Sequence, residues 1–119
     1  SRHLAAFDQR AQARLLAFVA MITGRSADVL QFGCPIGSLN IELGKDRRDL
    51  QLAARSLFDL FRDWLAACLR DLGRRSDAEP MALHLLGRAQ GIAVIAHAYR
   101  DAKLLRRETA MLRAWIRAF

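Results

Sequence analysis

The sequence has 119 residues, of which 53% are hydrophobic and 26% charged, and its formal net charge is +7. This length can bury enough apolar surface for one independent core, and with only 7 glycines and 2 prolines the composition predicts an all-α domain without strands. No stretch reaches the ~20 apolar residues of a membrane-spanning helix and the opening residues lack a secretory pattern, so we expect a cytoplasmic protein with no membrane partner.

The first half of the chain predicts two helical regions. Apolar residues from Leu4 to Ile22 have helical spacing, and Gly24 ends this region. The next residues show no clean periodicity until Pro35, a residue that suits the first turn of a helix. A short helix is therefore expected from about residue 36 to residue 43, stopped at Gly44.

A long amphipathic helix is predicted from Asp46, which suits an N-cap, to about Gly73. Its length of ~27 residues at ~1.5 Å per residue gives about 40 Å, enough to run the length of the domain. The next helix begins near Pro80 and continues to about Arg100, and the last covers residues 103–119. The short connection between them predicts an antiparallel pair within an antiparallel bundle of about five helices.

Three segments resemble the C-terminal part of TetR/AcrR-family transcriptional regulators. The run GCPIGSLNIELG at residues 33–44 is similar to the family's "GCP(I/L)GNLA.EL" sequence, which precedes a long helix. Residues 85–101, LLGRAQGIAVIAHAYRD, resemble its "LL...QGALLLARAYRD" helix, and residues 104–116 resemble its closing helix. The GCP sequence is typical of the LmrA/YxaF-like repressors of bacteria.

The resemblance implies a single C-terminal domain over residues 1–119 that binds a small hydrophobic effector and forms a homodimer. In such regulators an N-terminal helix-turn-helix domain reads operator DNA, and nothing before Leu4 corresponds to it. We therefore expect operator DNA to be bound only through that absent domain, with no DNA-binding residue in this chain. The resemblance identifies neither the effector nor the operator, and it leaves repression and activation open.

A stripe of small residues marks the candidate dimer interface. Gly87, Gly91 and Ala98 recur at helical spacing and would let another helix approach closely, which compensates for the ~1 kcal/mol that each glycine costs a helix relative to alanine. The resemblance places this stripe and the last helix in an intersubunit four-helix bundle; the alternative is packing within one subunit. The candidate interface residues are Gly87, Gly91, Val94, Ile95, Ala98, Leu105, Leu112 and Ile116.

Aromatic and apolar residues of the early helices and the long helix are candidates for an effector pocket. An ordinary filled core is the alternative for each of them. A buried amide needs partners, so Gln90 is satisfied within the protein, paired across a dimer or turned toward a ligand. The candidate pocket residues are Phe18, Met21, Ile22, Phe32, Phe58, Phe61, Trp64 and Gln90.

No metal site, cofactor or catalytic residue is predicted. His84 and His97 stand thirteen residues apart rather than at the three- or four-residue spacing of a helical metal site. Cys34 and Cys68 match no ligand or disulfide pattern and are expected to be reduced and buried, although thiolate reactivity can rise at a helix start such as that of Cys34. Nucleophiles and bases are too scattered for an enzyme, and no phosphate-binding loop is present.

The net charge of +7 suits a polyanionic partner but locates no binding site. Basic clusters at residues 70–75 and 106–117 are read as solvated helix faces. The competing hypothesis is a free-standing helical adaptor or a carrier of lipids or small molecules, which would use the same amphipathic helices. An in-frame helix-turn-helix upstream would favour the regulator.

Overall fold

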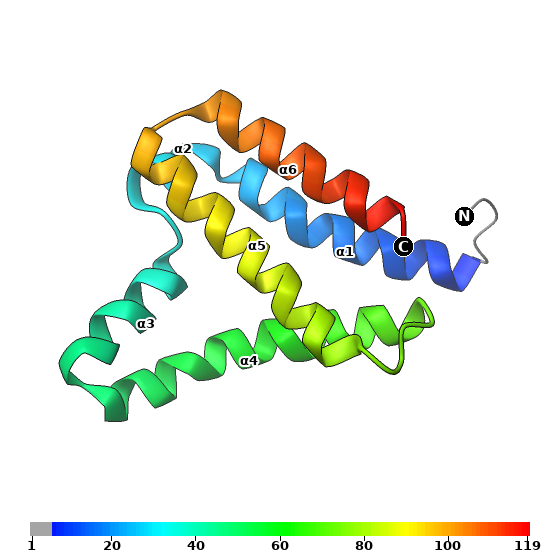
Figure 1. The fold of residues 1–119 in the computed structure, drawn as a ribbon, viewed down its shortest axis with the longest axis horizontal. Coiled ribbons are helices and arrows are strands. Elements are labelled where there is room, and N and C mark those ends of the chain that lie inside the picture. The colour runs from blue at the N-terminus through cyan, green and yellow to red at the C-terminus, as the bar shows by residue number, and fades with distance from the viewer. Residues whose placement is uncertain (1–5) are drawn as a thin grey trace.

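The computed structural model describes residues 6–119, which fold into six α-helices with no strand in that range. The all-α prediction is therefore confirmed, and Leu4 lies outside the described residues. The helices are α1 (Ala6–Gly24), α2 (Ser26–Phe32), α3 (Pro35–Asp46), α4 (Arg48–Asp71), α5 (Ala78–Tyr99) and α6 (Ala102–Arg117). Figure 1 shows α1, α5 and α6 packed together, with α4 crossing beside α5. The short helix α3 connects α2 to the start of α4 and packs against α4.

The Gly33-Cys34-Pro35 sequence forms the joint between α2 and α3. Gly33 has φ 72° and ψ −151°, a conformation that is open to glycine and strained for other residues. Cys34 is extended and Pro35 occupies the first turn of α3, where its missing N–H costs nothing. Sequence analysis did not predict α2, which ends at Gly33, where the backbone φ angle becomes positive.

The joint between α3 and α4 differs from the prediction. α3 continues through Gly44 to Asp46, and Arg47 caps both helices, so Asp46 is not the N-cap of α4. The side chain of Gln51 donates to the backbone oxygen of Asn40 at 2.9 Å, and the Asn40 amide donates to the oxygen of Ile36 at 2.9 Å. The Asn40 amide also donates to the oxygen of Ala54 at 3.4 Å, so this bond and the one from Gln51 join α3 to α4, and the buried asparagine is satisfied.

α5 and α6 form the predicted antiparallel pair. Arg100 adopts a left-handed conformation with φ 50°, and the Asp101 carboxylate accepts hydrogen bonds from the backbone N–H groups of Lys103 and Leu104 at 2.9 and 3.1 Å. The chain therefore reverses within two residues, and α6 returns beside α1 (Figure 1).

The core lies where α1, α4, α5 and α6 meet. Its fully buried large side chains include Leu15, Leu65, Leu69, Leu85, Leu105, Leu112 and Ile116. The molecule is flat, with extents of 48 × 34 × 17 Å, so its shortest dimension is less than two helix diameters.

No single helix of the described part is long and apolar enough to cross a membrane. Only the bent pair Asp8–Gly24 and Ser26–Asp46, taken together across an angle of 63°, reaches the required length and composition.

Candidate functional site

A cavity of about 710 Å³ lies between the first five helices. Its wall is mainly apolar, with aromatic side chains from α1, α2 and α4 and with two alanines, a leucine and a glutamine from α5. The lining residues are Phe18, Met21, Ile22, Arg25, Asp28, Val29, Phe32, Gly33, Cys34, Pro35, Ile36, Ser38, Phe58, Phe61, Leu86, Ala89, Gln90 and Ala93. Cavities of this size and composition bind small molecules in many proteins.

The structure brings seven of the eight candidate pocket residues to this cavity. They are Phe18, Met21, Ile22, Phe32, Phe58, Phe61 and Gln90. Trp64 does not line the cavity, since it lies on the outer side of α4 and is 42% exposed. Leu57, Leu60 and Trp64 are exposed at helical spacing, so α4 carries a second apolar stripe beside the one that faces inward.

The joint between α2 and α3 is held against α5 by two side chains. The Gln90 amide donates to the Cys34 sulfur at 3.2 Å, and His97 Nδ1 lies 3.0 Å from the backbone oxygen of Leu30. A Cβ at position 37 would overlap the amide oxygen of Gln90, so Gly37 permits this close approach. Gln90 is therefore paired within the subunit and at the same time lines the cavity.

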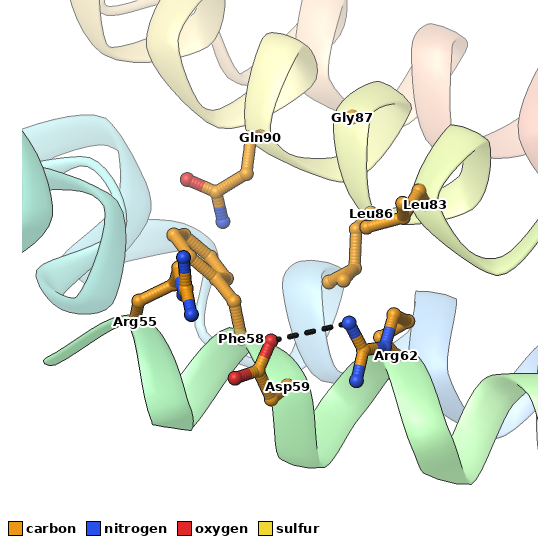
Figure 2. A pocket seen from close by; sticks show the side chains of 8 residues that line it. All are labelled: Arg55, Phe58, Asp59, Arg62, Leu83, Leu86, Gly87 and Gln90. Atoms are coloured by element: carbon orange, nitrogen blue, oxygen red, sulfur yellow. Dashed lines mark ion pairs between the residues drawn. The ribbon is translucent and has the colours of Figure 1, made fainter. Parts of the chain in front are cut away.

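A cleft of about 620 Å³ opens between α4 and α5 next to the cavity (Figure 2). Phe58, Leu86 and Gln90 line both spaces, so the two adjoin at these residues. The remaining lining residues are Arg55, Asp59, Arg62, Leu83 and Gly87. Figure 2 shows Phe58 rising from α4 toward Gln90, with Arg55 to one side of it and Arg62 to the other.

Ion pairs fix only one of the two arginines of the cleft. Arg62 lies 3.4 Å from Asp59 and 3.0 Å from Asp63, and the hydrogen bond that its guanidinium donates to the Asp63 carboxylate raises the pKa of Arg62 above its ordinary value. Arg55 forms no ion pair with any acidic residue of the described chain. The side chain of Arg55 is also exposed, as unpaired arginines on a protein surface commonly are.

The outer face of α5 is exposed and apolar. Val94 and Ile95 are 55% and 46% exposed, and Gly87, Gly91 and Ala98 are also exposed. A Cβ built on either glycine would meet nothing within 4 Å, so no packing inside the subunit requires a glycine there. The same helix turns Ala89, Gln90 and Ala93 toward the cavity.

The candidate interface residues of α6 need correction. Leu105, Leu112 and Ile116 are fully buried in the core of their own subunit and have no surface to offer a second copy. They pack inward because α6 turns this stripe toward α1 and α5. The exposed residues of α6 that sequence analysis did not select include Met111, 56% exposed, and Ala114, three positions later.

The two histidines lie in unrelated environments. His84 packs on Trp115 with ring centroids 5.3 Å apart, whereas His97 contacts Leu30 at the far end of α5. The described residues contain no group of three histidines, cysteines or acids that could hold a metal ion. Cys68 is buried as expected, whereas Cys34 is only half-buried.

The basic cluster at the end of α4 is partly neutralised. Arg70 pairs with Glu79 at 3.5 Å, and Arg74 pairs with Asp77 at 2.7 Å. The Arg74 guanidinium also lies 5.1 Å from the ring centroid of Phe119. These contacts hold the α4–α5 loop and the C-terminus together.

The family comparison matches residues 9–111, which span α1 from its second turn, the cavity and most of α6. The model is described as "Transcriptional regulator LmrA/YxaF-like, C-terminal domain". A search of curated proteins gives no match. Because the family model covers most of the chain, this protein belongs to the LmrA/YxaF-like C-terminal domain family of TetR-type transcriptional regulators.

Proposed function

We propose that this chain is the effector-binding and dimerisation domain of a transcriptional repressor. A small, largely apolar molecule binds in the cavity, and a homodimer forms through the outer faces of α5 and α6. DNA binding belongs to a helix-turn-helix domain outside this chain, which the family resemblance implies.

The observation that carries this proposal is the double role of α5. Ala89 and Ala93 line a cavity large enough for a small molecule, while Gly91, Val94 and Ile95 on the other side are exposed and apolar. Exposed apolar surface of this kind marks an interaction site in soluble proteins. A ligand in the cavity is therefore separated from the proposed partner subunit by the thickness of one helix.

The dimer face includes residues from both final helices. His84, Gly87, Gly91, Val94 and Ala98 are all exposed and follow one another at alternating spacings of three and four residues along α5. On α6, Arg107, Met111 and Ala114 are exposed with the same spacing. This spacing suits knobs-into-holes packing between helices of two subunits. In this proposed interface, Met111 and Ala114 replace Leu112 and Ile116, the α6 residues that sequence analysis had selected.

Regulation requires the effector to distinguish two arrangements of the dimer. Operator half-sites lie about one DNA turn, ~34 Å, or a multiple of it apart, so a pivot of the subunits would move the two DNA-reading domains out of register. A coupling of about 1–3 kcal/mol would change operator affinity about 5- to 150-fold. The effector must bind more tightly to the arrangement that cannot bind DNA.

The oligomeric state tests the proposal directly. Light scattering should give twice the chain mass of 13.4 kDa for the wild type and a single chain mass for Gly91→Trp, because the added indole projects from the outer face of α5. Ala67→Trp, on the exposed side of α4, is the matched control and should remain dimeric. A monomeric wild type would overturn the dimer and favour the carrier hypothesis.

A further inference from the structure

The cavity and the α4–α5 cleft meet at one wall. The cavity of about 710 Å³ and the cleft of about 620 Å³ share three lining residues, Phe58, Leu86 and Gln90. A side chain that lines both spaces separates them, because it has one space on each of its sides. These three residues therefore form a partition at which the cavity ends.

The cavity is open to solvent on one side and covered on the side of the partition. Met21 and Phe32 are 52% and 61% exposed, and the two charged lining residues, Arg25 and Asp28, are exposed as well. All exposed lining residues belong to the segment 21–38, whereas every lining residue from α4 and α5 is buried or half-buried. The partition thus lies on a covered wall that carries no charged side chain, which suits the apolar end of a ligand.

Phe58 is the least restrained of the three partition residues. Leu86 is 6% exposed and belongs to the core, and the Gln90 amide is bound to the Cys34 sulfur at 3.2 Å. The Phe58 ring is only partly buried and forms no hydrogen bond, and Figure 2 shows it rising from α4 toward Gln90 on the opposite helix. The size of this ring therefore decides where the cavity ends.

We propose that Phe58 is a specificity-determining residue that limits the length of the ligand. This inference rests on the proposed effector-binding function and specifies the class of its ligand, an elongated apolar molecule whose inner end stops against the Phe58 ring. Each methylene group that moves from water into the cavity strengthens binding about fourfold. Methylene groups that do not fit before the partition remain in water at the open side and add nothing. Affinity should therefore rise with chain length and then level off.

A homologous series of uncharged chains measures this length. Linear 1-alkanols from hexanol to tetradecanol compete with N-phenyl-1-naphthylamine, an uncharged dye whose fluorescence rises in apolar surroundings, and each competition gives a dissociation constant. For the wild type, the affinity should increase about fourfold per methylene group up to a break and then stay constant. Because the alcohols carry no charge and share one head group, differences along the series report chain length alone.

Replacing Phe58 tests its role. Phe58→Ala joins the cavity to the cleft and should move the break to longer chains. A shift of about two methylene groups widens the range of affinities between the shortest and the longest alcohols by about 15-fold. Phe58→Leu keeps an apolar side chain of intermediate size and should give a smaller shift in the same direction, so it provides the test if Phe58→Ala does not fold.

Filling the cleft tests whether the cleft is the added space. Arg55 lines the cleft but not the cavity, so Arg55→Trp should leave the wild-type break unchanged and return the break of Phe58→Ala to the wild-type length. The matched control is Phe61→Ala, which removes the same ring from the cavity wall but opens no route to the cleft. Adding Arg55→Trp to Phe61→Ala should leave its break unchanged.

The outcomes separate this inference from the proposed function. A break at the same length in the wild type and Phe58→Ala, a shifted break that Arg55→Trp does not reverse, or a wild-type affinity that rises without a break overturns the role of Phe58. Dye binding that is abolished by Ala93→Trp, which fills the cavity while circular dichroism shows an intact helical fold, still supports the effector site in each of these cases. If neither the dye nor any alcohol binds the wild type, the effector-binding function and this inference fail together.

Discussion

At the scale of single residues, Asp101 determines how the chain reverses between α5 and α6. One carboxylate oxygen accepts two backbone N–H groups of the first turn of α6. No other side chain in this turn provides such a cap, since the preceding Arg100 contributes only its left-handed backbone and a bond to the oxygen of His97. The antiparallel pair therefore depends on this cap, which sequence analysis did not predict.

We predict that Asp101→Ala lowers the free energy of unfolding by about 1 kcal/mol, because two N–H groups lose their acceptor. Urea denaturation monitored by circular dichroism measures the change. Asp101→Asn keeps a capping oxygen and should lose less than Asp101→Ala. Equal losses in the two variants would show that the negative charge, rather than the cap, is what matters.

Two glycines four residues apart should respond differently to alanine. Gly33 has φ 72° and ψ −151°, so Gly33→Ala should lower the free energy of unfolding by about 1–3 kcal/mol. At Gly37 the added Cβ meets only the end of the Gln90 side chain, which can rotate away. Gly37→Ala should therefore change stability by less than about 1 kcal/mol, because the gain in helix propensity offsets the lost bond to Cys34.

Thermal denaturation of the two variants side by side checks this difference. The rotated Gln90 should also alter ligand binding in Gly37→Ala. A Gly33→Ala protein as stable as the wild type would contradict the assigned backbone conformation.

At the scale of helices, α6 shows where sequence patterns reach their limit. Its apolar residues form two adjacent stripes with the same spacing, one containing Leu105 and Leu112 and the other containing Leu104 and Met111. Periodicity predicts the helix but not which stripe faces α1, and the structure buries the stripe that was assigned to the dimer. Which stripe of α6 is buried depends on its contact with α1, and a tertiary contact of this kind cannot be read from the periodicity of α6 alone.

The two faces of α6 predict opposite consequences for neighbouring residues. Leu112→Ala should lower the free energy of unfolding by about 2–5 kcal/mol, since Leu112 is fully buried in the core. Met111→Ala should change it by less than about 0.5 kcal/mol when measured in the Gly91→Trp background, where the proposed dimer is absent. In the wild-type background, Met111→Ala should instead weaken dimerisation in sedimentation experiments.

Other elements show the same division between local and tertiary information. The Gly33-Cys34-Pro35 sequence predicts its turn from backbone chemistry alone, and both flanking helix ends lie there. α2 was missed because its seven residues are too few for a periodic pattern and none is buried. The aromatic residues of the cavity were selected because large aromatics stand out in the sequence, whereas its smaller lining residues were not, and Trp64 was misplaced because α4 is apolar on two sides.

At the scale of the whole molecule, the flat shape bears on stability. A body 17 Å thick leaves most helices with one side in solvent, and Val94, Ile95, Tyr99 and Met111 are all exposed on α5 and α6. Burying such surface between two copies contributes about 25 cal/mol per Å² of apolar area, before the costs of association. The proposed second subunit would add a layer that the single chain lacks.

We predict that the urea midpoint of the wild type rises with protein concentration, because unfolding is then coupled to dissociation of the dimer. Measurements over a hundredfold range of concentration test this. Gly91→Trp should show no dependence on concentration and Ala67→Trp the same dependence as the wild type. A concentration-independent wild-type midpoint would argue against a dimer linked to folding.

Because α5 lies between the cavity and the proposed dimer face, substitutions on α5 can affect both ligand binding and dimerisation, whereas substitutions on other helices of the cavity affect ligand binding alone. Phe18, Met21, Phe32 and Phe61 come from α1, α2 and α4, so altering them reshapes the cavity without touching the outer face of α5. Ala89 and Ala93, by contrast, share their helix with Gly91. Retargeting this domain to a new inducer, as for a biosensor, should therefore begin with libraries on α1, α2 and α4 and leave α5 intact.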